Sequence, residues 1–200
     1  MKLIGMLDSP YVRRVAICLK VLGLEVQHQS LSVFSTFDEF RRINPVVKAP
    51  TLVLDDGQVL MDSSLILQLL DPHSRLWPAE SAARARAFRL TGLALAACEK
   101  AVQVVYEHNL RPAQKLHEPW LERVYGQLFA AWAELEKDLL AQPLNEEEST
   151  LGQAQVSIAV AWSFARMMLP ERVLAADYPT LAAFAETLER LPVFVQTPAV

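Results

Sequence analysis

The chain has 200 residues, a net charge of −4 and a hydrophobic content of 52%, which is enough apolar surface for one large core or two small ones. Its basic residues are spread along the sequence and cluster no further than pairs such as Arg13-Arg14, which argues against the basic patch of a nucleic-acid-binding protein. No apolar run is long enough for a signal peptide or a membrane span, so we expect a cytoplasmic protein with no membrane partner.

Residues 1–76 alternate between strand and helix patterns. The predicted elements are, in chain order, a strand over 2–6, a helix over 10–22, a strand over 25–31, a helix over 37–43, a hairpin of strands over 51–54 and 59–61, and a helix over 65–70. Local signals mark the helix ends: Pro10 suits a first turn, Gly23 a C-cap, and Thr36 with Glu39 a capping box. The β-α-β-α-β-β-α order predicts parallel strands around the first helix and an antiparallel final hairpin.

The first helix carries an apolar stripe from Val12 to Leu22, and Arg13, Arg14 and Lys20 lie elsewhere around it. Cys18 is expected on its packed side. Because Cys18 and Cys98 lie far apart, with no Cys-x-x-Cys spacing, the sequence predicts neither a disulfide framework nor a bound metal.

Residues 77–200 show only helix patterns, after a connector over 71–78 that contains two prolines. Helices are predicted over 81–109, 119–141, 150–169 and 179–191. Thr150 and Gln153 form a second predicted capping box at the start of the third of these helices. The sequence therefore predicts two domains, an α/β domain over 1–76 and an all-helical domain over 77–200.

Three motifs follow one another in the first 75 residues. The first is Ser9-Pro10, the second is Asn44-Pro45-Val46-Val47-Lys48-Ala49-Pro50-Thr51-Leu52, and the third is Asp62-Ser63-Ser64-Leu65-Ile66. In order and spacing they resemble the glutathione transferase family, in its bacterial serine-type cytosolic form. The resemblance implies a thioredoxin-like N-terminal domain, an all-α C-terminal domain and a homodimer. Two positions depart from the family pattern, since Val47 stands where Gly is frequent and Ala49 where Val is frequent.

The resemblance also implies how glutathione would be held as co-substrate. Pro50 would follow a cis bond, which lets the backbone of Ala49 pair with the cysteinyl part of glutathione. Ser63, at a helix N-terminus, would hold the γ-glutamyl carboxylate, Asp62 would face the ammonium group, and Lys48 would lie near the glycyl carboxylate. The plainer alternatives are a trans proline, two residues that only cap the helix, and a solvated lysine.

Ser9 matches the family position of the catalytic hydroxyl. The glutathione thiolate is the nucleophile, and a hydroxyl that donates a hydrogen bond to sulfur favours the ionised form, as does a nearby helix N-terminus. The alternative is that Ser9 only caps the helix that starts at Pro10.

The electrophilic second substrate is expected in an apolar pocket formed by both halves. Leu7 and Tyr11 flank Ser9, and Tyr106 and Trp162 are the candidates from the helical half. A tryptophan on an apolar helix is more often a core residue than a pocket wall, so that reading of Trp162 stays open.

The leading interpretation is a glutathione transferase that stabilises the thiolate for attack on a small hydrophobic electrophile, as in detoxification. Ser9 in place of cysteine argues against thiol-disulfide chemistry, which needs a protein sulfur at that position. A glutathione-dependent isomerase or dehalogenase would use the same thiolate with a different pocket. An interaction protein of the same fold, without transferase activity, is the alternative outside enzymes.

Overall fold

The structure is a computed structural model that describes residues 1–199. Within them the chain divides into two compact units. The first, here called the sheet unit, contains Met1–Pro78, Glu147–Gly152 and the segment from Arg190 on; the second, the helical unit, contains Ala79–Glu146 and Gln153–Glu189. The sheet unit thus includes two segments from the later part of the sequence.

The sheet unit is built on a four-stranded sheet with the order β2-β1-β3-β4. The strands are β1 (Lys2–Ile4), β2 (Gln27–Gln29), β3 (Thr51–Val53) and β4 (Val59–Met61), so the first three are shorter than the predicted ranges. β1 pairs with β2 in parallel and with β3 antiparallel, and β3 pairs with β4 antiparallel. This mixed sheet confirms the predicted thioredoxin-like order.

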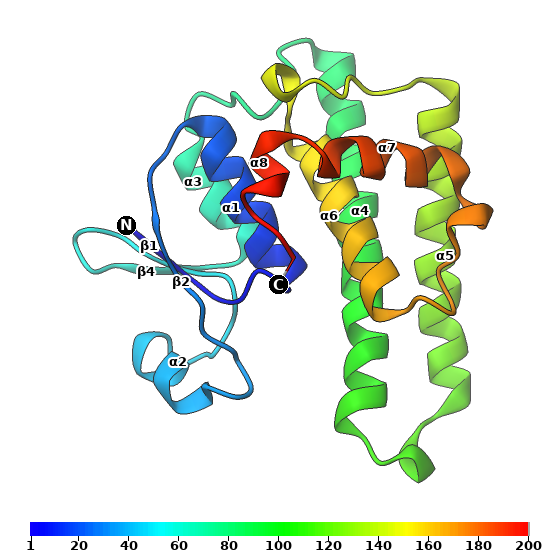
Figure 1. Ribbon diagram of the computed structural model, residues 1–200, viewed down its shortest axis with the longest axis horizontal. Helices are drawn as coiled ribbons and strands as arrows, with labels where there is room; N and C mark the ends of the chain where they lie inside the picture. Colours follow the sequence, from blue (N-terminus) through cyan, green and yellow to red (C-terminus); the bar gives the residue numbers. More distant parts are fainter. Residues whose placement is uncertain (200) are drawn as a thin grey trace. The chain divides into compact units, whose positions relative to one another are not determined.

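Helices cover both faces of this sheet. The helices of the sheet unit are α1 (Pro10–Leu22), α2 (Phe37–Ile43), α3 (Ser63–Leu70), the 3-10 turn η2 (Glu148–Thr150) and α8 (Pro192–Val195). Ile4 packs with Leu31 and with Phe40 of α2, and strand alternation places Leu3 on the opposite face. There α1 lies beside α3, as Figure 1 shows. The sequence did not predict α8, which begins at a proline directly after the predicted fourth long helix.

α1 is buried nearly all round, and this includes Arg13 and Arg14, whose exposed fractions are 3% and 2%. Arg13 donates from Nε to the carbonyl oxygen of Thr197 at 2.7 Å, and its guanidinium lies over the Phe194 ring. α1 therefore packs against α3 on one side and against the C-terminal segment with α8 on another.

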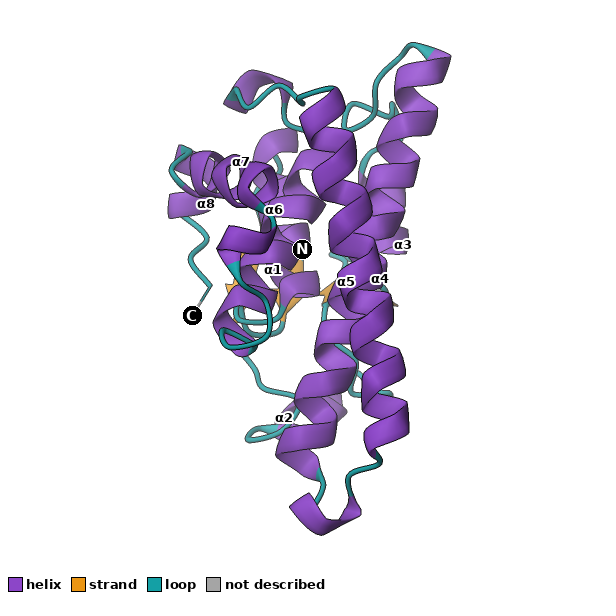
Figure 2. Cartoon of the chain, turned by 90° about the vertical axis from the view of Figure 1, so that its right-hand side faces the viewer, coloured by secondary structure: helices purple, strands orange, loops and turns teal. Residues whose placement is uncertain are grey.

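The helical unit consists mostly of long helices, and helices are drawn in purple in Figure 2. Its elements are α4 (Ser81–Leu110), η1 (Ala113–Lys115), α5 (Glu118–Ala141), α6 (Gln153–Met168), η3 (Ala175–Asp177) and α7 (Pro179–Glu189). α4 packs against both α5 and α6, and α7 packs against α5 and α6 (Figure 1). The four predicted helices are confirmed, with the start of α6 moved from residue 150 to 153.

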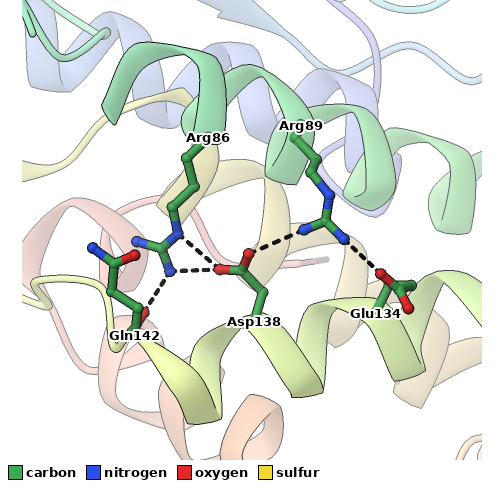
Figure 3. Close-up of polar contacts among 5 residues, drawn as sticks. All are labelled: Arg86, Arg89, Glu134, Asp138 and Gln142. Carbon is green, nitrogen blue, oxygen red and sulfur yellow. Dashed lines mark hydrogen bonds and ion pairs between the residues drawn. The ribbon is translucent and has the colours of Figure 1, made fainter. Parts of the chain in front are cut away.

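Charged side chains join one end of α4 to α5 (Figure 3). Arg86 binds Asp138 Oδ1 through Nε at 2.8 Å and also donates to the carbonyl oxygen of Gln142. Arg89 bridges Asp138 Oδ2, at 3.0 Å, and Glu134 Oε2, at 2.5 Å. Because this network shares one carboxylate between two arginines, it fixes the register of the two helices more firmly than a single exposed ion pair would.

The capping box predicted at Thr36 is wrong, and α6 begins at Gln153, which the second predicted box placed within the first helical turn. Thr36 precedes α2 but makes no capping bond to it, because its hydroxyl accepts from the Ser32 N–H at 2.8 Å and donates to the Ser32 carbonyl at 3.0 Å. Thr150 ends η2, where its hydroxyl donates to the Glu147 carbonyl. At Thr36 a local turn competes for the hydroxyl that the pattern assigned to a helix start.

Among the helices of residues 1–199, none combines the length and the apolar character that crossing a membrane requires.

Candidate functional site

One end of the sheet gathers the three sequence motifs. Strand register aligns Ile4, the last residue of β1, with Thr51, the first of β3, and Thr51 with Met61, the last of β4. The chain therefore leaves β1 toward Ser9, enters β3 from Pro50 and leaves β4 toward Asp62 at the same end. The sheet topology, rather than sequence proximity, brings the three motifs together.

Ser9 is the residue before α1, with an extended backbone of φ −70° and ψ 120°. Its carbonyl accepts from the Arg13 N–H at 2.9 Å, but its side chain makes no capping bond to the helix. The expectation that the hydroxyl caps α1 is therefore not met. Leu7 and Tyr11, on either side of Ser9, are half-buried.

The loop over 44–50 is shaped by a buried amide. Asn44 Nδ2 donates to Thr51 Oγ1 at 2.8 Å, and its Oδ1 accepts from the Val46 N–H at 3.0 Å. The Thr51 hydroxyl in turn donates to the Lys48 carbonyl at 2.7 Å. The sequence analysis did not assign a role to Asn44 or Thr51, although together they hold the turn before β3.

The end of this loop contains the peptide bond between Ala49 and Pro50, which is cis, as expected. Pro50 is buried, Ala49 is half-buried, and the side chain of Lys48 is exposed. Val47 has φ 52°, a left-handed conformation that is uncommon for a β-branched residue. It stands at the position where glycine is frequent in the family that the sequence motifs resemble.

Asp62 and Ser63 form the start of α3. Asp62 Oδ1 accepts from the Ser64 N–H at 2.9 Å, so the capping role considered for Asp62 is present. Its backbone lies at φ 70° and ψ 121°, a conformation rarely populated outside glycine and often found at functional sites. Ser63, at the first helical position, is only 4% exposed.

Arg14 reaches this helix start from α1, and sequence reasoning missed it. Its Nη1 donates to Ser63 Oγ at 3.0 Å and to Ser64 Oγ at 3.2 Å. The sequence offers only a slight hint that Arg14 is buried: it is the second of two arginines in a helix that also carries a wide apolar stripe. A positive charge thus lies beside the N-terminus of α3, which itself favours an anion.

The two candidates from the helical half lie in the other unit. Tyr106, near the end of α4, is 42% exposed. Trp162 on α6 is buried and contacts Trp132 and Tyr178 edge-on, at centroid distances of 5.4 and 5.8 Å. These contacts account for Trp162 as a core residue of the helical unit, and its assignment to a pocket stays a prediction.

Neither cysteine belongs to this candidate site. Cys18 and Cys98 are buried thiols outside any disulfide, and Cys18 faces the packed side of α1 as expected. Burial raises the pKa of Cys18 from 9.0 to about 12, against a smaller lowering by the Arg14 charge. Such a thiol stays protonated at neutral pH. In the part of the chain that the structure describes, no three His, Cys, Asp or Glu side chains form a group that could hold a metal.

Comparison with known proteins agrees with this geometry. Residues 3–75 match the glutathione S-transferase N-terminal domain. A glutathione transferase family member from Pseudomonas fluorescens Pf-5, solved with bound S-(propanoic acid)-glutathione, is 32% identical over 98% of each chain, with a TM-score of 0.81.

Two further relatives widen the range of activities. A glutathione S-transferase from Methylobacterium radiotolerans, solved with glutathione sulfonate, is 26% identical over 98% of this chain and 93% of that one, with a TM-score of 0.87. A probable maleylacetoacetate isomerase from Caenorhabditis elegans is 28% identical over 91% of this chain and 84% of its own. The chain belongs to the glutathione transferase family.

Proposed function

We propose that this protein is a glutathione-dependent enzyme that binds reduced glutathione in the sheet unit and stabilises its thiolate for attack on a small electrophile. The observation that carries the proposal is the shared end of the sheet. There the chain leaves β1 toward Ser9, enters β3 from Pro50 and leaves β4 toward Asp62. The known relatives with bound glutathione or its derivatives support the same ligand.

Binding rests on Ser63, Asp62, Ala49 and Lys48. Ser63 and the N-terminus of α3 bind the γ-glutamyl carboxylate, and Asp62 faces the ammonium group. The N–H and C=O of Ala49 pair with the cysteinyl backbone, as an added strand would. Lys48, exposed beside Ala49, attracts the glycyl carboxylate.

Ser9 acts on sulfur as a hydrogen-bond donor. When the glutathione thiol releases its proton to water, the Ser9 hydroxyl and the N-terminus of α1 stabilise the negative sulfur. The thiolate then forms a C–S bond with the electrophilic carbon, and the electron pair of the broken bond leaves with the departing group. This assigns the chain to the serine-type members of the family.

The second substrate is a small hydrophobic electrophile, and Leu7 and Tyr11, which flank Ser9 in the sheet unit, are its proposed contacts. Transfer of an alkyl or aryl group is the proposed reaction. Glutathione-dependent isomerisation is the second candidate, because the Caenorhabditis elegans relative is a probable isomerase and the same thiolate would start that reaction. Assays with an aryl halide and with a cis-configured unsaturated diacid, each with glutathione, separate the two.

A homodimer, a cytoplasmic location and functional domains over 1–76 and 77–200 belong to the same proposal. Exposed Leu65 and Leu69 lie one turn apart on α3, and such an apolar stripe favours a contact with a second copy. Two buried thiols outside any disulfide are compatible with a reducing compartment. Sedimentation equilibrium of the purified protein tests the dimer.

The experiment that tests the proposal is calorimetric titration with reduced glutathione, for the native protein and for Ser63→Ala. We expect saturable binding that the substitution weakens by about 1–3 kcal/mol, the effect of a lost hydrogen bond to a charged group. No binding at millimolar glutathione would instead favour the interaction-protein alternative.

A further inference from the structure

The Arg14 side chain is buried directly behind the proposed carboxylate anchor. It is 2% exposed, and its Nη1 donates to the hydroxyl oxygens of Ser63 and Ser64. Arginine is seldom buried unless its charge is well bonded, because removal from water costs several kcal/mol. Arg14 and Ser63 are separated by 49 positions in sequence, so only the packing of α1 against α3 creates the contact.

This contact determines what the Ser63 hydroxyl can do. A guanidinium only donates hydrogen bonds, so the Ser63 oxygen must accept, and its own single proton has to point toward a different acceptor. The backbone N–H groups of the first turn of α3 are donors and cannot take it. A hydroxyl that already accepts from a cation is also polarised into a stronger donor.

We propose that Arg14 is a positioning residue for glutathione: through Ser63 Oγ it aims the hydroxyl proton at the γ-glutamyl α-carboxylate, and its charge favours that anion. The proposal rests on the proposed function and deepens it, because it gives the carboxylate end of the ligand a second, buried determinant. Arg14 does not need to touch glutathione for this role.

The competing explanation is that Arg14 only fastens α1 to α3. Arg13 provides the matched control for this explanation. It is equally buried on the same helix, and its Nε donates to the Thr197 carbonyl at the other end of the sequence. A loss of packing or of buried charge would therefore appear in both variants, whereas an effect on the anchor would appear only at Arg14.

The test uses two ligands that differ in one group: reduced glutathione, and 4-aminobutanoyl-cysteinylglycine, which lacks only the α-carboxylate. Dissociation constants are measured by calorimetry for the native protein, Arg14→Gln, Arg14→Lys and Arg13→Gln. We expect Arg14→Gln to weaken glutathione about tenfold or more, the range for a hydrogen bond to a charged group, and to change the analogue by less than about twofold. Arg14→Lys, which keeps the charge, should lie between, and Arg13→Gln should keep the native preference for glutathione.

A double-mutant cycle makes the dependence on Ser63 explicit. If Arg14 acts through Ser63, then Arg14→Gln in a Ser63→Ala background adds much less than it does alone. Additive losses would mean that Arg14 acts independently of the hydroxyl, which would overturn the proposal.

Three further results would also be decisive. Equal weakening of both ligands by Arg14→Gln would leave Arg14 as packing support and overturn the proposal. Failure of both Arg14 variants to show a cooperative thermal transition, while Arg13→Gln folds, would do the same. If the native protein binds the analogue as tightly as glutathione, Arg14 has no carboxylate to act on, whereas failure to bind either ligand would reject the proposed function itself.

Discussion

Gly5 lies so close to Val12 that a Cβ built on Gly5 would stand 2.6 Å from Cγ2 of Val12. The same added atom would lie 3.2 Å from the Cβ of Ala49, so Gly5 is in contact with both α1 and the loop before β3. Its φ of 137° is accessible to glycine alone in practice. The turn after β1 can therefore approach the candidate site only because residue 5 has no side chain.

Gly5→Ala is expected to lower the free energy of unfolding by about 2–4 kcal/mol, through the unfavourable φ and the clash with a stiff, fully buried valine. Gly57→Ala is the control, since Gly57 also has a positive φ, of 88°, but has open space around it. Urea denaturation of both variants separates the free-energy cost of the unfavourable φ, which both share, from that of the clash with Val12, which only Gly5→Ala has. A loss at Gly5 no larger than that at Gly57 would show that the crowding is relieved without cost.

At position 47 a glycine variant is expected to be more stable than an alanine variant, the reverse of the usual order of stability. Because the φ of Val47 is 52°, an L-residue with a Cβ is strained there by about 1–2 kcal/mol. Val47→Gly should therefore be more stable than Val47→Ala by about 1 kcal/mol, although both lose the packing of Val47 against the Ile4, Leu31 and Phe40 cluster. Thermal unfolding of the pair compares them directly, and a more stable alanine variant would contradict the left-handed conformation.

Ser9→Ala is expected to reduce kcat with glutathione and a reactive aryl halide by about 100-fold, the effect of removing one donor from a developing anion. Glutathione should still bind within about threefold, since its carboxylates and backbone are held elsewhere. The pH profile of kcat/KM should move to higher pH, because the bound thiol then ionises less readily. Unchanged turnover and an unchanged profile would remove Ser9 from the mechanism.

The buried thiol of Cys18 is expected to make the folded protein less stable at alkaline pH. Its folded pKa is raised from 9.0 to about 12, so above about pH 9 the unfolded chain loses this proton while the folded protein retains it. The contribution is fully present below pH 9 and is lost as the pH rises toward 12. Relative to a Cys18→Ala variant, the native protein should thus become progressively less stable between pH 8.5 and about 10.5, as followed by urea denaturation. Parallel stability curves for the two proteins would show that Cys18 is not held protonated.

Much of the sheet unit could be predicted because local signals and the sheet agree. The strand and helix order, the hairpin, the buried Cys18 and the cis bond before Pro50 all follow from short patterns or from the motif order. The same motif order indicated Ser9 and Ser63, and the topology explains why residues so far apart in sequence meet at one sheet end.

The parts that sequence missed depend on acceptors far along the chain. A helical pattern treats Arg13 and Arg14 as polar positions, whereas both are buried because Thr197 and Ser63 supply oxygens to them. Thr36 failed as a helix cap for the opposite reason, since a nearby turn takes its hydroxyl. A pattern of residue types predicts neither a hydrogen-bond acceptor far along the chain nor a local turn that takes a hydroxyl.

The contact between Arg13 and Thr197 has a consequence for how the protein is made. The two residues are 184 positions apart, so α1 leaves the ribosome long before the segment that covers it. Until Thr197 emerges, the nascent sheet unit exposes a flank of α1 and lacks the Thr197 carbonyl that accepts from Arg13. Residues of the helical unit are synthesised in between, and the sheet unit is completed only after α8 and Thr197 have left the ribosome. Nascent chains arrested behind C-terminal linkers of increasing length would show protease protection of α1 only once the linker carries Thr197 out of the ribosomal tunnel.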